Sequence, residues 1–329
     1  MTNLRAGLIG LGMMGRHHAR VLASLPGVDL VAVADPGGDV HRVSGGRPVE
    51  AHIEALIGHG LDYCMVAVPT IYHEATGLAL AEAGVHAMIE KPLASDTSAA
   101  TAVARAFAAR GLVGAVGHIE RYNPALQQAR ARLEAGELGD VYQVVTRRQG
   151  PFPARIADVG VVKDLGTHDI DLTAWVTQQE YTSVSARTAH RSGREHEDMV
   201  AIVGLLSNGT ITNHLVNWLS PFKERVTVIT GTKGSFVANT LSADLTFHAN
   251  GEIEQAWDAI SKFRGVSEGD VVRYAIPKPE PLRVEHEQFR DAVLGLDADI
   301  VTMAQGLRTV RVAEACLESA SSGRTVDLA

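Results

Sequence analysis

The sequence predicts an α/β domain with a parallel, doubly wound sheet, followed by an α+β domain with an open, mostly antiparallel sheet. Over the first ~120 residues, short continuous apolar runs alternate with alanine-rich segments of helical spacing, the pattern of parallel strands covered on both faces. From Tyr181 to about His248, strand-like segments follow one another, with hairpin signals at Asn208-Gly209 and Lys233-Gly234. A length of 329 residues exceeds one ordinary core, so we expect two domains, 1–120 and 121–329.

The composition is that of a soluble globular protein, with 46% hydrophobic and 21% charged residues. A formal net charge of −8 disfavours nucleic acid, although a local basic patch could hold a small anionic substrate. The two cysteines, Cys64 and Cys316, exclude a disulfide framework and favour a reducing compartment. The N-terminal stretch is a poor signal peptide and no apolar run could span a bilayer. We therefore expect a cytoplasmic protein without membrane contact.

Five apolar runs predict the strands of the first domain: RAGLIG, VDLVAVAD, DYCMVAVP, VHAMIE and LVGAVGH. Helical segments lie between them, among them EATGLALAEAG and SDTSAATAVARAFAARG. The second of these begins at the favourable N-cap residues Ser95-Asp96 and ends at Gly111.

The pattern changes after Glu120. A helix, NPALQQARARLEAGELG, is followed by a strand, DVYQVVTRR, a Gly/Pro-bearing loop, QGPFPARIADVG, and a second helix, VVKDLGTHDIDLTAWV. Two closing helices begin near Arg283 and Val301.

A glycine-rich loop, GLGMMG, places Gly10, Gly12 and Gly15 between the first strand and a helix, and Asp35 ends the next strand. Glycines at this spacing allow the backbone, including Met13 and Met14, to approach a pyrophosphate at the helix N-terminus, while the acid accepts hydrogen bonds from a ribose. The alternative is a plain strand–turn–helix of another α/β protein. The complete pattern favours a Rossmann dinucleotide site.

Asp35 also bears on the choice of cofactor. A carboxylate repels the 2′-phosphate of NADP, and Pro36-Gly37-Gly38 supplies no immediate arginine to hold it, although Arg42 could reach. NAD is therefore favoured over NADP.

Glu90, Lys91 and Pro92 end the strand VHAMIE. In an open α/β sheet, ligands bind at the carboxyl ends of the strands, so Lys91 is expected near the reactive end of a bound dinucleotide. The alternative is a solvated lysine at a strand end.

Asp164 and His168 are four residues apart in a helical segment and share a face, with Asp171 nearby. Three interpretations compete. One is a buried, satisfied histidine, and a second is a metal site, which lacks a further ligand cluster. The third is a proton-transfer pair in which the carboxylate tunes the histidine. Together with the glycine loop and Lys91, the third is favoured, and we expect no metal.

The motifs GLGMMGRHHARVL, EKP and DLGTHDIDL, in this order, resemble the Gfo/Idh/MocA family of sugar and polyol oxidoreductases over essentially the whole chain. The phrases GHIERYNPAL, GPFPARIADVGVVKDLGTHDIDL and KERVTVITGTKGSF are similar to a narrower branch, the UDP-N-acetylglucosamine 3-dehydrogenases and their nucleotide-sugar relatives.

The resemblance implies roles for individual residues. Lys91 would be a catalytic lysine between the nicotinamide and the reacting hydroxyl, and Pro92 would fix its backbone, often through a cis peptide. Glu90 would approach the nicotinamide ribose, and Asp164 and His168 would face the substrate. Further residues would lie along the cofactor, namely Pro69, Thr70 and His73.

Several polar residues are weaker candidates for substrate binding. Arg121 and Asn123 begin the second domain, and Arg148 and Arg155 flank the Gly/Pro loop, where they could hold a diphosphate. The alternative for each arginine is a solvated surface charge.

These observations favour an NAD-dependent dehydrogenase that oxidises a secondary hydroxyl, at C3, of a UDP-N-acetylhexosamine-type nucleotide sugar. Inositol, a free sugar or an amino-sugar intermediate are alternative substrates, and a non-catalytic dinucleotide-binding sensor is the alternative from another class. The apolar segments MVAIVGLL and ITNHLVNWL predict an exposed sheet face and hence a homodimer or homotetramer.

Overall fold

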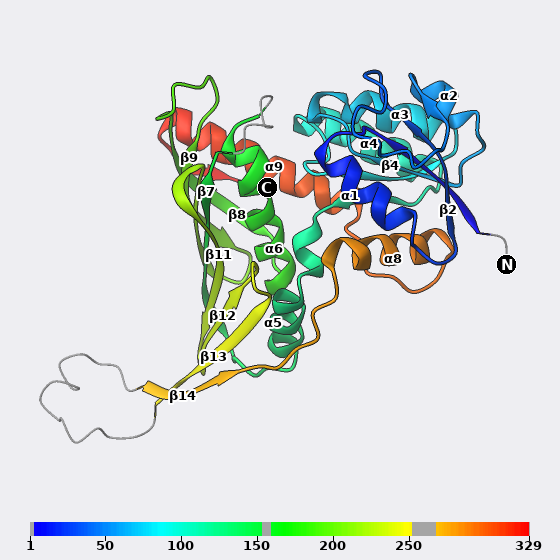
Figure 1. Cartoon of the computed structure of the whole chain (residues 1–329). Coiled ribbons are helices and arrows are strands. Elements are labelled where there is room, and N and C mark those ends of the chain that lie inside the picture. The colour runs from blue at the N-terminus through cyan, green and yellow to red at the C-terminus, as the bar shows by residue number, and fades with distance from the viewer. Residues whose placement is uncertain (1–2, 153–158, 252–267, 329) are drawn as a thin grey trace, which may run out of the picture. The chain divides into compact units, whose positions relative to one another are not determined.

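The computed structural model describes residues 3–152, 159–251 and 268–328, and the chain divides into two compact units (Figure 1). Unit 1 comprises Met1–Ile119 and Glu280–Glu314, and unit 2 comprises Glu120–Pro279 and Ala315–Ala329. The expected boundary at residue 120 agrees with the first of these junctions. The expected assignment of all of 121–329 to a second domain differs from the structure, because Glu280–Glu314 packs with unit 1.

Unit 1 is built on a parallel sheet, as the sequence predicts. Its strands follow the spatial order β3-β2-β1-β4-β5-β6, and the chain reverses direction across the sheet between β1 and β4. The strands are β1 (Leu4–Ile9), β2 (Val28–Ala34), β3 (Val49–Glu50), β4 (Tyr63–Val66), β5 (His86–Glu90) and β6 (Gly114–Gly117). The sequence analysis did not predict β3 or the short helix α2 (Ile53–Ile57) that follows it.

The helices of unit 1 follow most of the predicted segments. They are α1 (Met13–Leu22), α3 (His73–Glu82), α4 (Thr97–Ala109), α8 (Pro281–Val293) and the part of α9 (Met303–Ser322) up to Glu314, with the 3-10 turn η1 (Thr70–Tyr72) before α3. Asp96 caps α4 by accepting a hydrogen bond from the Ala99 amide at 2.9 Å, as expected. Gly111, just beyond its end, has a φ of +64°.

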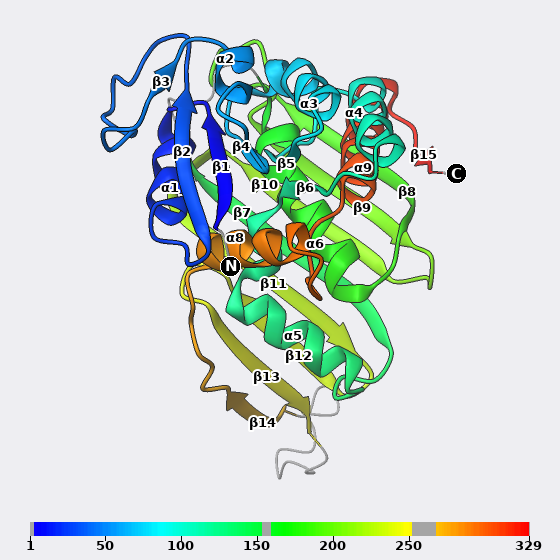
Figure 2. The same ribbon diagram turned by 90° about the vertical axis from the view of Figure 1, so that its right-hand side faces the viewer.

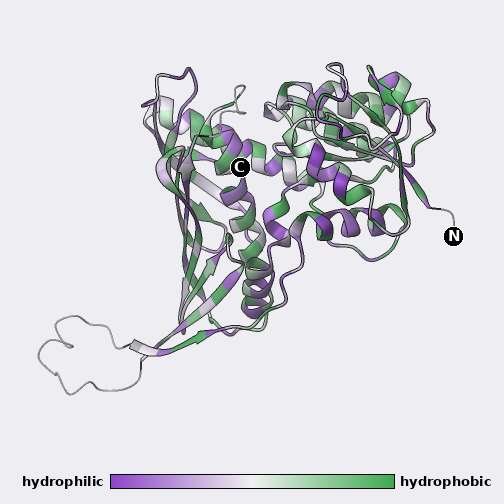
Figure 3. Cartoon of the chain, viewed as in Figure 1, coloured by the Kyte–Doolittle hydropathy of each residue, from purple (hydrophilic) through white to green (hydrophobic). Residues whose placement is uncertain are grey.

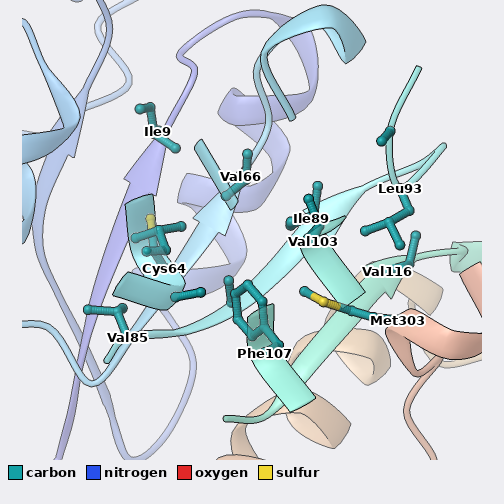
Figure 4. Packing of buried hydrophobic residues seen from close by; sticks show 14 of the residues in the cluster. Ile9, Cys64, Val66, Val85, Ile89, Leu93, Val103, Phe107, Val116 and Met303 are labelled. Atoms are coloured by element: carbon teal, nitrogen blue, oxygen red, sulfur yellow. The ribbon is translucent and has the colours of Figure 1, made fainter. Parts of the chain in front are cut away.

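Hydrophobic side chains bury both faces of this sheet, and successive residues of a strand alternate between two clusters. Ile9, Cys64 and Ile89 belong to the cluster drawn in Figure 4, together with Phe107 of α4. Their strand neighbours Leu8, Tyr63, Met65 and Met88 belong to the second cluster, which Phe289 of α8 joins. The Phe289 and Tyr63 rings meet edge to face with centroids 5.4 Å apart. This contact explains why the late segment belongs to unit 1.

Unit 2 is built on a second, mostly antiparallel sheet, also as predicted. The order is β14-β13-β12-β11-β7-β10-β9-β8-β15, and β7 and β10 form a parallel pair within it. The strands are β7 (Val141–Pro151), β8 (Tyr181–Ala189), β9 (Met199–Leu206), β10 (Ile211–Asn217), β11 (Leu219–Gly231), β12 (Gly234–Asn239), β13 (Asp244–Asn250), β14 (Glu268–Arg273) and β15 (Val326–Asp327). Both predicted hairpins are confirmed by the β9–β10 and β11–β12 pairings.

Helices cover one face of this sheet. Figure 2 shows α5 (Pro124–Glu134) and α6 (Thr167–Thr177) lying across it, and their residues Leu126 and Leu172 share a buried cluster with Val144 and Phe236 of the strands. Helices α1 and α8 carry both hydrophilic and hydrophobic residues (Figure 3).

The other face of the unit 2 sheet exposes large apolar side chains. Burial alternates along β9, so that Val200 and Ile202 are buried while Val203 and Leu205 are exposed. Leu205 pairs directly with the exposed Ile211 of β10. We call this set the exposed sheet face: Met199, Val203, Leu205, Ile211 and Leu215.

Among the described helices, none combines the length and the apolar character that crossing a membrane requires.

Candidate functional site

The glycine loop joins β1 to α1, and each glycine has a distinct structural reason. Gly10 has a φ of +91°, and a Cβ there would lie 2.5 Å from the backbone of Ala67. A Cβ on Gly15 would lie 2.0 Å from the carbonyl oxygen of Gly10, so only glycine lets the helix pack against the loop. A Cβ on Gly12 would meet no atom within 4 Å.

The N-terminus of α1 suits an anionic ligand. Gly12 is the N-cap and provides no capping side chain, and no acidic residue occupies the first turn, where Met13 is exposed and Met14 half-buried. The first amides of a helix lack intrahelical acceptors and carry the positive end of the helix dipole. The open space beside Gly12 allows a phosphate group to approach these amides, so the loop fits the pyrophosphate of a dinucleotide.

Asp35 follows β2 and connects the two neighbouring loops. Its Oδ2 accepts a hydrogen bond from the Leu11 amide and its Oδ1 one from the Gly37 amide, both at 2.8 Å. A carboxylate has about four acceptor positions, so Asp35 retains capacity for ribose hydroxyls. Arg42 lies in the loop after β2, where it is exposed.

His73 ties together the loops after β4 and β5. Its Nδ1 lies 2.8 Å from the carbonyl oxygen of Pro92 and its Nε2 lies 3.0 Å from that of Val68, and the side chain is buried. Thr70, in η1, is also buried, whereas Pro69 is exposed. Of these three expected cofactor neighbours, Pro69 presents its side chain to solvent, and His73 supports the loops from inside unit 1.

Glu90 and Lys91 lie at the carboxyl end of β5, and the Lys91–Pro92 peptide is cis, as the resemblance implied. Glu90 Oε2 accepts a hydrogen bond from the Lys91 amide at 3.1 Å, and Oε1 lies 2.9 Å from Nε2 of His18. Burial raises the pKa of Glu90, but the hydrogen bond from His18 and the charge of Lys91 outweigh burial and hold the pKa below its usual value. Lys91 is half-buried.

Unit 1 thus gathers most of the predicted cofactor residues at one edge of its sheet. The loops after β1, β2, β4 and β5 all leave the carboxyl ends of parallel strands, and β1 and β4 flank the point where the strand order reverses. Ligands of open α/β sheets bind at this point.

Asp164 and His168 lie in unit 2 on one continuous helical stretch. Asp164 belongs to a π-helical turn, η3 (Val162–Gly166), and His168 to the first turn of α6. Asp164 is buried and His168 half-buried. The side chain of Glu197 supports the turn by accepting a hydrogen bond from the Val162 amide at 3.0 Å. The sequence predicted an unbroken α-helix; π turns inside helices are frequent at functional sites.

Two of the expected substrate-binding arginines are buried in ion pairs. Arg121 donates from Nε and Nη2 to both carboxylate oxygens of Asp171, at 2.8 and 2.6 Å. Arg148 donates to Asp169 and Glu120, both at 2.8 Å. Burial lowers the pKa of Arg148, but the two carboxylates outweigh it and raise the pKa above its ordinary value. These contacts occupy donors that a diphosphate would need.

Asn123 acts as a helix cap. Its Oδ1 accepts a hydrogen bond from the Ala125 amide at 3.1 Å, and its Nδ2 donates to the Thr240 carbonyl at 2.9 Å. Arg155 lies outside the described residues. Within the described ranges, no group of three or more His, Cys, Asp or Glu side chains is placed to hold a metal ion.

The sequence analysis missed a set of buried ionisable groups that lie next to Glu90 in the interior of unit 1. It did not single out His18, Glu285 or His286, yet all three are almost completely buried in unit 1. The available signal was the position of His18, three residues after Gly15 on the inward face of α1.

Two family models match the chain. Residues 4–118 match the model described as an oxidoreductase family with an NAD-binding Rossmann fold, and residues 126–237 match the GFO/IDH/MocA C-terminal domain. Together the two models cover well over half of the chain.

Individual relatives are similar in sequence and in structure. The chain is 34% identical over 216 residues to UDP-N-acetylglucosamine 3-dehydrogenase of Acidithiobacillus ferrooxidans, a match covering 65% of this chain and 66% of the relative. It is 32% identical over 192 residues to scyllo-inositol 2-dehydrogenase (NAD(+)) of Bacillus subtilis, covering 55% and 56%. These matches thus span two thirds or less of each relative's length.

A solved structure of the Acidithiobacillus ferrooxidans enzyme aligns with a TM-score of 0.86 at 26% identity, covering 98% of this chain and 99% of that one.

Proposed function

The chain belongs to the Gfo/Idh/MocA family of NAD-binding oxidoreductases, and from this membership we propose that it oxidises a secondary hydroxyl of a sugar with NAD. The observation that carries the proposal is the arrangement at the carboxyl edge of the unit 1 sheet. There the glycine loop, Asp35 and Lys91 follow β1, β2 and β5 of the same sheet.

The cofactor would be held by residues whose geometry is described above. The first amides of α1 and the glycine loop would hold the pyrophosphate, and Asp35 would accept from the adenosine ribose and disfavour a 2′-phosphate. Glu90 would approach the nicotinamide ribose, as in the family. When bound, NAD supplies the acceptor for the hydride that leaves the alcohol carbon.

Oxidation of an alcohol also requires that a proton leave its oxygen. In our proposal His168 accepts this proton, because an imidazole titrates near neutrality, and the buried carboxylate of Asp164 increases its basicity. Lys91 holds the hydroxyl and stabilises the negative charge that develops on its oxygen. The reverse assignment is the alternative, since two coupled groups can share one proton.

The substrate class we propose is a UDP-N-acetylhexosamine, oxidised at C3. Support comes from the similarity to UDP-N-acetylglucosamine 3-dehydrogenase over 216 residues. The ion pairs of Arg121 and Arg148 weaken the expectation that arginines bind a diphosphate. They engage two of the three guanidinium groups expected to hold it. Diphosphate binding would then depend mainly on Arg155.

Inositol is the second candidate substrate. The similarity to scyllo-inositol 2-dehydrogenase, at nearly the same identity, specifically favours it. A substrate without phosphate would also agree with the carboxylate partners of Arg121 and Arg148.

The experiment is a screen of nucleotide sugars, free sugars and inositols with NAD, followed by the absorbance of reduced nicotinamide. The nucleotide-sugar proposal expects turnover of UDP-N-acetylglucosamine or a close relative, and inhibition of slower substrates by UDP. Efficient turnover of an inositol, with UDP-sugars neither reacting nor competing, would support the second candidate. If the protein binds NAD but oxidises no alcohol, the result would favour a non-catalytic dinucleotide-binding sensor.

We also propose that the chain forms a homodimer or homotetramer through the exposed sheet face. Contiguous exposed apolar side chains on neighbouring strands are unusual on a monomer and favour association. Light scattering at micromolar concentration tests this. Leu205→Glu is expected to lower the measured mass, whereas Val40→Glu, at an exposed position of unit 1, should not. A monomeric wild-type protein would contradict the proposal.

A further inference from the structure

A chain of buried side chains leads to the backbone of Lys91 from inside unit 1. His286 Nε2 lies 2.8 Å from His18 Nδ1, and His18 Nε2 lies 2.9 Å from Glu90 Oε1. The second oxygen of Glu90 accepts from the Lys91 amide. Both histidines are almost completely buried, and their rings meet edge to face with centroids 5.1 Å apart.

The chemistry of these groups fixes the direction of the hydrogen bond between His18 and Glu90. A carboxylate can only accept, so Nε2 of His18 carries the hydrogen that faces Glu90. Burial and the neighbouring His18 hold the pKa of His286 well below its ordinary value, so His286 is neutral at pH 7. In the arrangement that we consider, Nε2 of His286 donates to Nδ1 of His18 across the 2.8 Å that separates them. Each donor then points toward Glu90.

A second acidic residue, Glu285, lies close to Glu90 but carries no negative charge. Glu285 precedes His286 on α8 and is almost completely buried. Neither of its carboxylate oxygens has a hydrogen-bond partner within the described residues. Burial, and secondly the charge of Glu90, raise the pKa of Glu285 well above its usual range, which keeps it protonated. Glu90 is therefore the carboxylate of the group.

We propose that His18 and His286 are positioning residues that keep Glu90 as a carboxylate bound to the Lys91 amide, and so fix where Lys91 meets its substrate. This inference rests on the proposed role of Lys91. The groups that face Glu90 are His18 from α1, the adjoining Lys91, and Glu285 from α8. Because Glu285 is protonated it adds no charge, so burial favours the protonated form of Glu90, and His18 and Lys91 oppose it.

Removal of His18 should therefore change the pH dependence of catalysis. In His18→Leu, burial is no longer offset by the histidine, so the pKa of Glu90 rises. The acidic limb of the kcat profile should move to higher pH, with a loss of about tenfold or more on the acidic side of the profile and recovery on its alkaline side. His286→Leu should cause a smaller shift in the same direction, because it removes only the donor to His18.

Conservative variants separate positioning from packing. Glutamine carries a donor at the position of Nε2, so His18→Gln and His286→Gln each keep the hydrogen bond that points toward Glu90. Both should show a smaller shift than the corresponding leucine variants. His86→Leu is the matched control, because His86 lies at the opposite end of β5 and its Nδ1 accepts from the Val113 amide at 2.8 Å. This variant should lower the melting temperature without moving the kcat profile.

The outcomes are distinguishable. Profiles of His18→Leu and His286→Leu that coincide with the wild-type profile, in folded protein, would overturn the inference. If His18→Leu does not fold, the comparison of His286→Leu with His286→Gln decides. Long-range ¹⁵N–¹H spectra of the imidazole rings in the NAD-free protein provide a test that does not need activity, and an Nδ1-protonated neutral His18 would contradict the proposed direction. Absence of any alcohol oxidation by the wild type would count against the proposed function instead.

Discussion

Arg121 and Asp171 form a two-pronged ion pair in which 6% of the arginine side chain and 2% of the aspartate side chain are exposed. The pair connects the segment that begins unit 2 to helix α6, the helix that also carries His168. A buried guanidinium with such a partner is first of all a structural group.

The first prediction concerns the stability that this pair provides. Asp171→Asn leaves the guanidinium buried without its countercharge, and the expected loss is about 3–5 kcal/mol. The matched control is Glu134→Gln in the half-exposed Arg130–Glu134 pair, with an expected loss of about 0.3–0.5 kcal/mol. Urea unfolding measures both. Equal losses would contradict the structural role, and a raised KM for a UDP-sugar in Arg121→Lys at unchanged stability would instead place Arg121 at the substrate.

The second prediction separates the roles of two glycines. Gly12→Ala should fold normally, because its Cβ meets open space, but should weaken NAD binding by about tenfold or more, which is about 1.4 kcal/mol, because the methyl occupies the place of the pyrophosphate. Gly15→Ala should destabilise the fold, since its Cβ overlaps the Gly10 carbonyl. Calorimetric titration with NAD and thermal unfolding measure the two effects. Unchanged affinity in Gly12→Ala would argue against this cofactor position.

The third prediction concerns the choice between NAD and NADP. Asp35→Ser removes the charge that repels a 2′-phosphate, so the preference for NAD should narrow or invert. The carboxylate also accepts hydrogen bonds from the Leu11 and Gly37 amides. Asp35→Asn removes the charge but keeps one acceptor oxygen for these amides, so it separates the loss of the charge from the loss of the hydrogen bonds. The ratio of kcat/KM for the two cofactors is the measurement. A wild-type enzyme that already uses NADP better would refute the argument from Asp35.

The fourth prediction concerns the groups proposed to handle the proton. Lys91→Ala and His168→Ala should each lose turnover by ~10²–10⁴, about 3–5 kcal/mol, while NAD binding persists. His59→Ala, which removes a half-exposed histidine paired with Glu50, should leave turnover unchanged. Steady-state kinetics beside a cofactor titration make the comparison. Near-normal turnover in Lys91→Ala would mean that the lysine is only a charge at a strand end.

The fifth prediction follows from the raised pKa of Glu285. The folded state holds this proton, whereas the unfolded chain releases it above about pH 4.3. The stability that the protonated acid contributes is therefore complete below that pH and is lost as the pH rises toward the folded-state pKa. Glu285→Gln has no proton to release, so its stability relative to wild type should increase from pH 5 to pH 8. Urea midpoints that differ by the same amount at both pH values would show that Glu285 is ionised in the fold.

Features fixed by neighbouring residues could be predicted from the sequence. The Asp96 cap and the turn at Asn208-Gly209 each depend on a few adjacent residues, and the structure confirms both. The place of α8 could not be predicted in this way. It depends on contacts between distant residues, such as Phe289 with Tyr63, which no local pattern encodes.

The same difference holds for the candidate site. The glycine loop and Lys91 were identified because a strand end and a glycine spacing are visible in the sequence. For Arg121 and Arg148 the sequence shows the charge but not the partner, and the carboxylates of Asp171 and Asp169 on α6 become partners only through the fold. The parallel pairing of β7 with β10, which are separated by several elements in the chain, was missed for the same reason.

The interruption of unit 1 by unit 2 has a consequence for protein synthesis. The ribosome releases Tyr63 and the rest of the early sheet long before it makes α8 and α9, so the hydrophobic surface that these two helices cover stays exposed during translation of the intervening residues. A recombinant fragment that stops at residue 120 would keep this surface exposed, and we expect it to aggregate. A fragment intended to isolate the NAD-binding part would need residues 280–314 joined to it by a linker.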